Sequence, residues 1–131
     1  MAGKIVADTL EHSTAGSIAT NYVVNGSAKA LVNYTSITTT TIRDSFNISS
    51  VTDVSTGRTQ PISFTSNMNS ADYYGSYYNN ASTTGDSYQN MNNDYAGGFG
   101  SKTTSSFGLQ SYSTTMVDCH VNDAIIHGDL A

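Results

Sequence analysis

Apolar side chains along this chain stand one at a time, separated by hydroxyl and amide side chains. The run from Thr35 to Thr65, TSITTTTIRDSFNISSVTDVSTGRTQPISFT, shows this spacing most clearly. It holds too few long aliphatic side chains for helices, and its Ser, Thr and Asn residues compete with a helical backbone for hydrogen bonds. Thr, Val, Ile, Tyr and Phe instead suit a pleated, half-buried surface. The pattern therefore predicts an all-β protein.

Turn signals divide the chain into roughly six or seven short strands. The dipeptide Asn-Gly at positions 25–26 predicts a hairpin with strands at Tyr22–Val24 and Lys29–Tyr34, because both turn residues accept a positive φ. A second hairpin is expected from Phe46 to Phe64. Pro61 cannot donate a ladder hydrogen bond, so it should begin a strand or lie at a sheet edge.

Alternating patterns predict further strands in the second half of the chain. The pairs Tyr73–Tyr74 and Tyr77–Tyr78 fit a strand in which one ring of each pair faces each side. The run SFGLQSYS, which begins at Ser106, predicts another strand, and TMVDCHVNDAIIHG predicts a last one between Thr115 and Gly128. Short strands at turn-separated intervals indicate a small antiparallel β-sandwich.

The chain's 131 residues suffice for one domain, predicted over residues 19–131 after an extended N-terminal arm at residues 1–18. The hydrophobic fraction of 37% lies below the roughly 45–50% of soluble domains, a benchmark that also counts Gly. A small domain of ordinary composition buries only about 60–70% of its unfolded surface, and a polar one gains less from doing so. We therefore expect copies of the chain to complete the core together as a homotrimer.

The charge of the chain and the spacing of its apolar residues exclude two classes of partner, nucleic acid and a membrane interior. The formal net charge is −5 and only five Lys and Arg residues occur, so no basic stripe is present to neutralise nucleic-acid phosphates. No apolar run reaches the roughly 18 residues that a membrane span requires. The opening residues also lack the basic and apolar segments of a secretory signal. A single cysteine, Cys119, excludes an intrachain disulfide.

Two groups of residues have the types that reactive or metal-binding sites use. Asp118, His120 and Asn122 would share one face of the last strand and carry ligands suited to a cation. A solvated polar face fits the same pattern. Cys119 could form a nucleophile–base pair with one of the three histidines, but it alternates with apolar residues, so a buried thiol is expected. We therefore expect no enzymatic activity, no cofactor and no catalytic metal.

Tyrosine is concentrated between residues 73 and 100, among Asn, Ser and Gly. Tyr combines a rigid ring face with a hydroxyl, and Ser, Gly and Asn add adaptable hydrogen bonds, which is the mixture that paratopes use. The segment is therefore predicted to present variable, partner-facing loops. The alternative is that the rings pack between neighbouring strands or subunits. The candidate receptor- or partner-binding residues are Tyr73, Tyr74, Tyr77, Tyr78, Tyr88 and Tyr95.

Two long runs in the first half of the chain resemble a module of virion proteins. They are GKIVADTLEHSTAGSIATNYVVNGSAKALVNY and TTIRDSFNISSVTDVSTGRTQPISFTSNMNSADY. With the variable segment Tyr73–Gly100 and the closing strand Val117–Asp129, they are similar to a recurrent module in tail-fibre and related virion proteins of marine tailed bacteriophages, of the cyanophage and pelagiphage type. The similarity spans essentially the whole chain. Leu31 and Tyr34 stand where that family often has Trp and Phe.

This resemblance implies a structural virion protein, a tail fibre or fibre tip that contributes to attachment at the host surface, where a glycan is the expected receptor. A head or tail decoration protein, which binds another virion protein without touching a receptor, remains the alternative. In both cases the arm at residues 1–18 would dock to the virion. The resemblance further implies an independent small protein that is assembled in the host cytoplasm and resides in the virion.

Overall fold

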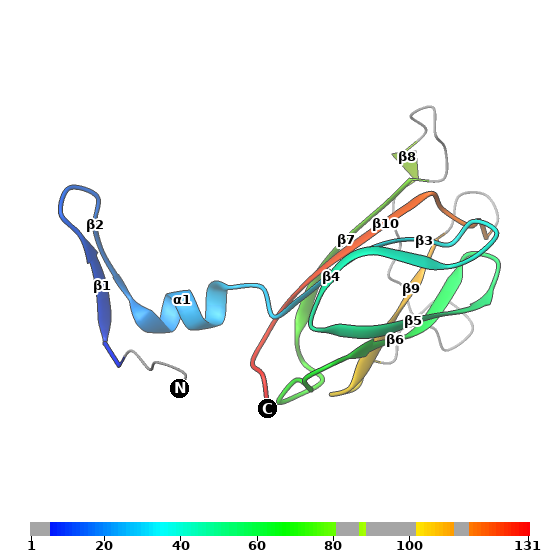
Figure 1. Cartoon of the computed structure of the whole chain (residues 1–131). Coiled ribbons are helices and arrows are strands. Elements are labelled where there is room, and N and C mark those ends of the chain that lie inside the picture. Colours follow the sequence, from blue (N-terminus) through cyan, green and yellow to red (C-terminus); the bar gives the residue numbers. More distant parts are fainter. Residues whose placement is uncertain (1–5, 81–86, 89–101, 112–115) are drawn as a thin grey trace.

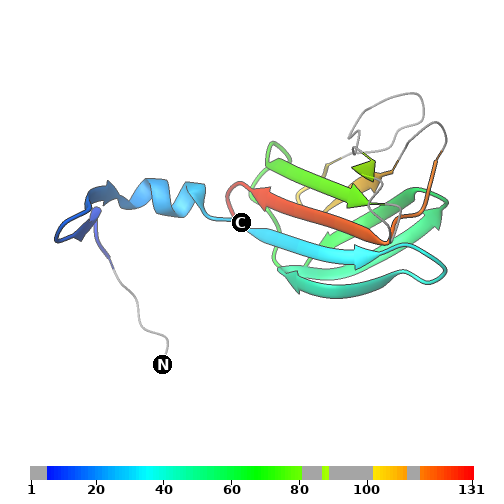
Figure 2. The same ribbon diagram turned by 90° about the horizontal axis from the view of Figure 1, so that it is seen from above.

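Figure 1 shows the computed structural model of the chain, which describes residues 6–80, 87–88, 102–111 and 116–131. Nearly all of the regular structure in these residues consists of antiparallel strands, and the one helix among them is short. The prediction of an all-β fold is thus confirmed. Two sheets face each other, and a small separate hairpin precedes them (Figures 1 and 2).

The larger sheet has the strand order β4-β3-β10-β7-β8, with every neighbouring pair antiparallel. The last strand of the chain, β10, lies between β3 and β7. The sheet is therefore complete only when the C-terminal strand has inserted between two strands that come much earlier in the sequence. The bounds are β3 (Ala30–Thr35), β4 (Thr41–Phe46), β7 (Tyr74–Asn80), β8 (Ser87–Tyr88) and β10 (Val121–His127).

The smaller sheet contains the predicted second hairpin, which is confirmed as β5 and β6. Its turn holds Gly57 at φ +69°, and a Cβ at this position would lie 2.6 Å from the Ser111 carbonyl oxygen. Both the positive φ and this close approach require a glycine. The strands are β5 (Ile48–Ser55), β6 (Arg58–Phe64) and β9 (Ser106–Gln110), with β6 in the middle.

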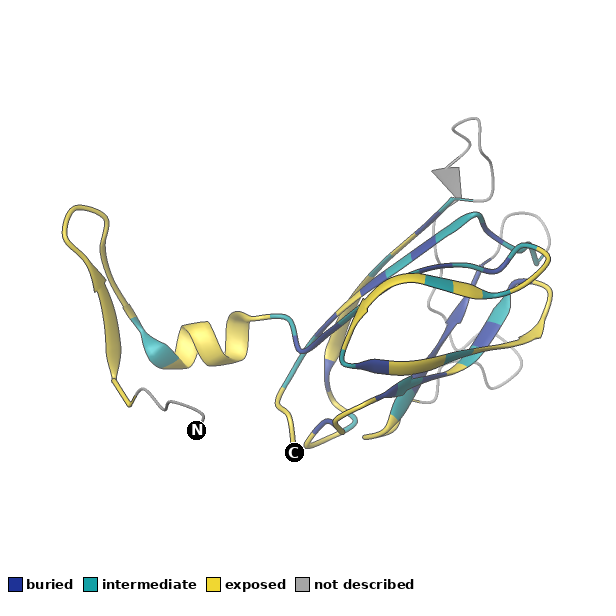
Figure 3. Cartoon of the chain, in the orientation of Figure 1, coloured by how far each residue is buried: buried dark blue, intermediate teal, exposed yellow. Residues whose placement is uncertain are grey.

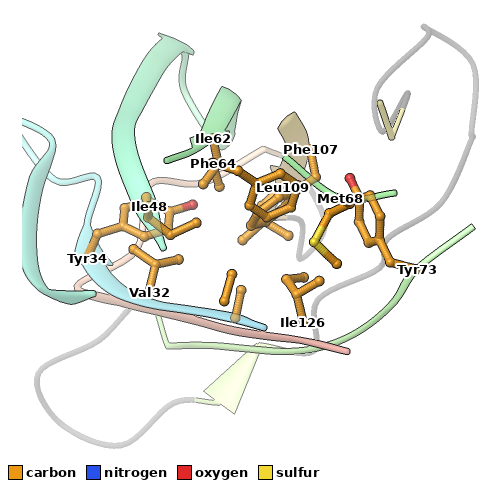
Figure 4. Close-up of a cluster of buried hydrophobic side chains, with 12 residues drawn as sticks. Val32, Tyr34, Ile48, Ile62, Phe64, Met68, Tyr73, Phe107, Leu109 and Ile126 are labelled. Atoms are coloured by element: carbon orange, nitrogen blue, oxygen red, sulfur yellow. The ribbon is translucent and has the colours of Figure 1, made fainter. Parts of the chain in front are cut away.

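The core lies between the two sheets (Figures 3 and 4). Along β3 and β10 every second side chain is buried, because successive residues of a strand point to opposite faces. Tyr77 of the larger sheet packs against Phe107 of the smaller one, with 6.2 Å between ring centroids. The buried cluster comprises Ala30, Val32, Tyr34, Ile48, Ile62, Phe64, Met68, Tyr73, Phe107, Leu109, Ala124 and Ile126.

Asn47 lies where the chain passes from the larger sheet to the smaller one. Its φ of 56° is in the left-handed region, which Asn tolerates better than most residues. Its side-chain amide donates to the carbonyl oxygens of Lys29 and Ser66, at 3.0 and 3.1 Å. Its side-chain oxygen accepts from the Ser66 N–H at 2.6 Å. These bonds stabilise the corner between β4 and β5.

The prediction for Pro61 is wrong. Pro61 lies in the middle of β6, which pairs with strands on both sides, rather than at a strand start or a sheet edge. The pairing with β9 is irregular between Thr59 and Ile62, and the pairing with β5 is irregular between Val51 and Asp53. The missing N–H of proline therefore falls where the ladder is already interrupted, as in a β-bulge.

The first predicted hairpin is wrong in its N-terminal strand. Thr20–Gly26 form the helix α1, whose last turn is followed by a hydrogen bond from the Ser27 N–H to the Val23 carbonyl oxygen at 3.1 Å. The second strand of that hairpin does form, as β3. Both edges of β3 are occupied, by β4 and β10. No edge is left for Tyr22–Val24, so this segment forms its backbone hydrogen bonds locally.

The segment before β3 lies outside the sandwich (Figure 1). β1 (Thr9–His12) and β2 (Gly16–Ala19) pair as a hairpin, and α1 follows directly. None of the side chains in these three elements is buried, and the segment is mostly yellow in Figure 3. Its exposed apolar side chains are those of Val6, Leu10, Ile18, Tyr22, Val23 and Val24.

Candidate recognition surface on strand β7

Two of the candidate tyrosines point into the core. Tyr73, just before β7, is 3% exposed. Its ring meets that of Phe64 edge-on at 5.5 Å, and its hydroxyl donates to the Ser106 carbonyl oxygen at 2.8 Å. Tyr77 packs against the same core. Burial raises the pKa of both phenols. These two rings pack between strands, as the alternative interpretation of the segment expects.

Tyr74 and Tyr78 face the other way. Tyr74 is 80% exposed and Tyr78 is 48% exposed. In the antiparallel register with β10, Tyr74 lies opposite His127 and Tyr78 lies opposite Asp123. One ring of each tyrosine pair therefore faces each side of the sheet, as predicted. The two exposed tyrosines are spaced about 13 Å apart along the strand.

The outer face of the larger sheet extends from these tyrosines across β10, β3 and β4. Ile125 lies opposite Leu31, and Leu31 lies opposite Phe46. Ile125 and Phe46 are 44% and 56% exposed. In the next row, the Asp123 carboxylate accepts a hydrogen bond from the Asn33 amide. The outer face thus places an apolar row beside a polar one, with the exposed tyrosines at its margin.

The structure shows less of the remaining two candidate tyrosines, Tyr88 and Tyr95. Tyr88 lies in β8, where it pairs with Asn79 of β7. Tyr95 lies outside the described residues, together with the Gly-rich part of the variable segment. Among the residues that the structure describes, Tyr74 and Tyr78 are therefore the candidates that share one exposed face.

An open hollow of about 280 Å³ lies beside Tyr74 at one end of this face. Its walls come from three segments that are far apart in the sequence, so no local pattern could reveal it. In the sequence, only Tyr74 pointed to this region, because it lies in a segment with an unusual concentration of Tyr, Asn, Ser and Gly. The polar lining consists of Asn25, Asn69, Ser70, Asp72, His127 and Asp129.

The last strand begins later than predicted, because β10 starts at Val121. Asp118, His120 and Asn122 therefore do not share a strand face. Asp118 accepts a hydrogen bond from the Gly57 N–H at 2.7 Å, whereas Asn122 is buried. In the described ranges, no three His, Cys, Asp or Glu residues form a group that could hold a metal ion.

Cys119 is fully buried just before β10, as predicted. Its N–H donates to the Ser36 hydroxyl at 2.9 Å. Burial raises the pKa of the thiol, which keeps it protonated and weakly nucleophilic near neutral pH. The Cys119 carbonyl oxygen accepts from the Asn122 amide at 3.3 Å, and Asn122 accepts from the Ser111 hydroxyl at 3.2 Å. The Cys119 backbone thus belongs to a buried hydrogen-bonded cluster.

No protein-family model, curated protein or solved structure matches this chain. The resemblance to the tail-fibre module therefore stays a prediction from the sequence. Within the part of the chain that the structure describes, no helix has the length and hydrophobicity to cross a membrane. The fold defines a protein of the all-β class with an exposed, tyrosine-bearing sheet face.

Proposed function

We propose that this chain is a structural virion protein of a tailed phage, a tail-fibre or fibre-tip component that contributes to attachment at the host surface. The observation that carries the proposal is the exposure of Tyr74 and Tyr78 on one face of a sheet. The resemblance of the NGSAKA and IRDSFNISSVTD runs to the virion module supplies the setting. No enzymatic step is part of the proposal.

Two properties suit this face to recognition. First, β7 pairs with β10 along its whole length, so both rings project from a rigid frame and lose little conformational entropy on binding. Second, the rings share the face with the exposed apolar side chains of Ile125 and Phe46. Aromatic side chains that combine an apolar body with a hydroxyl are enriched where proteins bind partners.

The proposal includes a homotrimer whose N-terminal segments dock to the particle. β1, β2 and α1 bury none of their side chains within the chain, and an isolated two-stranded hairpin or short helix is marginally stable in water. Contact with other chains would cover the exposed apolar residues. Light scattering should report three times the chain mass of 13.9 kDa. A folded, cooperative monomer would contradict the trimer.

Phage particles that carry the double variant Tyr74→Ala/Tyr78→Ala test the attachment role. Because both rings are exposed, the variant should fold and enter particles normally, while adsorption to host cells should fall roughly tenfold. Ser76→Ala, on the same strand and face, is the matched control. Normal adsorption by fully assembled double-variant particles would contradict the attachment role, and absence of the protein from purified particles would contradict the virion setting.

The exposed apolar side chains of the N-terminal segment favour a second candidate, a head or tail decoration protein that binds another virion protein without receptor contact. Deletion of residues 2–17 separates the two. In a fibre component, the deletion should reduce both incorporation and adsorption. In a decoration protein, the truncated chain should be lost from particles that still adsorb normally.

A further inference from the structure

The hollow beside Tyr74 is built where three segments meet at one end of the sandwich. The end of α1 contributes Asn25, the segment before β7 contributes residues 69, 70, 72 and 73, and the end of β10 with the residues after it contributes residues 127–129. Its volume of about 280 Å³ is near the lower limit of small-ligand pockets. The hollow therefore suits one small ring of a ligand rather than an extended chain.

Hydrogen bonds hold two of the three walls of the hollow in place. The Asn69 N–H donates to the Asp129 carbonyl oxygen at 2.7 Å, which ties two walls together. The Asp72 N–H donates to the Ser70 hydroxyl at 2.8 Å. Just beyond, Met68 and Leu130 form an antiparallel bridge. These two walls are already fixed and lose little freedom when a ligand binds.

The lining matches the chemistry of a polyol. The Tyr74 ring, 80% exposed, offers a flat face on which the C–H face of a sugar can stack. Amide, hydroxyl and imidazole groups around it both donate and accept hydrogen bonds, whereas the carboxylates of Asp72 and Asp129 accept. Sugar hydroxyls also donate and accept, so they fit this mixture better than a simple cation, which needs acceptors alone.

We infer that the hollow is a binding subsite for a neutral saccharide. The inference rests on the attachment role proposed above and deepens it, because it names the class of ligand and the place where it binds. The two carboxylates define the specificity. An acidic sugar would bring a further negative charge beside Asp72 and Asp129, in a chain whose net charge is already −5, and like charges in one site disfavour binding.

Saturation-transfer NMR on the full chain tests the ligand class. The probes are methyl glucoside, methyl galactoside and methyl mannoside, with glucuronic acid as the acidic counterpart and tetramethylammonium as a simple cation. At least one neutral glycoside should bind with a Kd on the order of 1 mM, as expected for a ligand of few atoms. Glucuronic acid should bind roughly tenfold more weakly. The inference is wrong if no neutral glycoside binds, or if either charged probe binds more tightly than all of them.

Matched variants test the location. Tyr74→Ala should raise the Kd roughly tenfold, whereas Tyr78→Ala, on the same strand and face but outside the hollow, should change it by less than about twofold. The double variant Asp72→Asn/Asp129→Asn should remove most of the discrimination against glucuronic acid. Equal losses of affinity in Tyr74→Ala and Tyr78→Ala would place the binding elsewhere. Unchanged discrimination against glucuronic acid in Asp72→Asn/Asp129→Asn would also place it elsewhere, and either result would overturn the inference.

The NMR and adsorption results separate the two proposals. If glycosides bind at Tyr74 but particles with the tyrosine double variant adsorb normally, the saccharide subsite stands and the attachment role fails. If no glycoside binds but the double variant still abolishes adsorption, the attachment role stands and the saccharide inference fails.

Discussion

The sandwich and the N-terminal segment are made of similar residues, but only the sandwich covers its apolar side chains. Along β3, buried side chains alternate with half-buried ones, whereas β1 and β2 have none that are buried. Leu10 and Ile18 lie opposite each other in the β1–β2 register, yet both are 46% exposed. The hairpin pairs its backbone as the sandwich strands do, but no second layer from the described residues lies over it.

This difference shows that an alternating pattern is not enough to bury apolar residues. In the sandwich, β5, β6 and β9 cover the inner face of the larger sheet and together with it form one core. For β1, β2 and α1, the described residues supply no covering layer. The two regions should therefore respond very differently to the same kind of perturbation.

High pH should have the largest effect, acting through buried rings of the sandwich. Burial raises the pKa of Tyr34, Tyr73 and Tyr77 above the usual value of a phenol. The native state keeps these protons at a pH where the unfolded chain has lost them. Stability from these groups is therefore complete below about pH 10 and is lost as the pH rises further.

Circular dichroism during an alkaline titration should show the sandwich unfolding. Tyr34→Phe removes one of the ionising groups and should move the unfolding midpoint to higher pH. Tyr22→Phe, in the exposed helix α1, is the control and should leave the midpoint unchanged. A midpoint that Tyr34→Phe does not move would show that burial of this phenol does not govern alkaline stability.

Truncation of a core ring is expected to have the next largest effect. Phe107 is 2% exposed and lies between Phe64 and Tyr77, so Phe107→Ala should lower the free energy of unfolding by about 3–5 kcal/mol. Ile18→Ala, in the exposed hairpin, should change it by no more than ~0.5 kcal/mol. Urea unfolding followed by circular dichroism measures both. Similar losses would mean that Ile18 is covered by another chain in solution.

Loss of the buried amide at the end of the sandwich should cost less than loss of a core ring. Asn122 accepts from Ser111 and donates to the Cys119 carbonyl oxygen. Asn122→Ala leaves these buried groups without their partner and should lower the free energy of unfolding by about 1–3 kcal/mol. Asn33→Ala, on the outer face, is the matched control and should cost less in the same urea experiment. A larger loss of stability in Asn33→Ala than in Asn122→Ala would contradict a structural role for the buried cluster.

Deletion of residues 2–17 is expected to have the smallest effect on the sandwich. These residues bury no side chain within the described part of the chain, so the urea midpoint should shift by less than the equivalent of about 1 kcal/mol. The truncated protein should keep its β-type circular dichroism spectrum. A large shift would mean that the N-terminal segment packs against the sandwich of a neighbouring copy.

Much of the fold could be predicted from local patterns. The hairpin at Gly57 and the strand of SFGLQSYS follow from spacing within a few residues, because side-chain direction alternates along a strand. Cys119 is buried as predicted, but it lies before β10, so strand alternation is not the reason. The tyrosine pairs were similarly informative, since adjacent residues must face opposite sides. The pattern alone could not say which ring of each pair would be covered, because that depends on where the second sheet lies.

Contacts between distant segments decided the rest. Tyr22–Val24 became helical because β10 and β4 occupy both edges of β3, and Pro61 is tolerated inside β6 because the ladder is irregular on both sides there. The hollow exists only because α1, the segment before β7 and the end of β10 meet. The sequence by itself determined that the chain forms strands with two unlike faces. The tertiary structure decided which faces are buried and which remain exposed, because burial requires a second layer that strand periodicity does not specify.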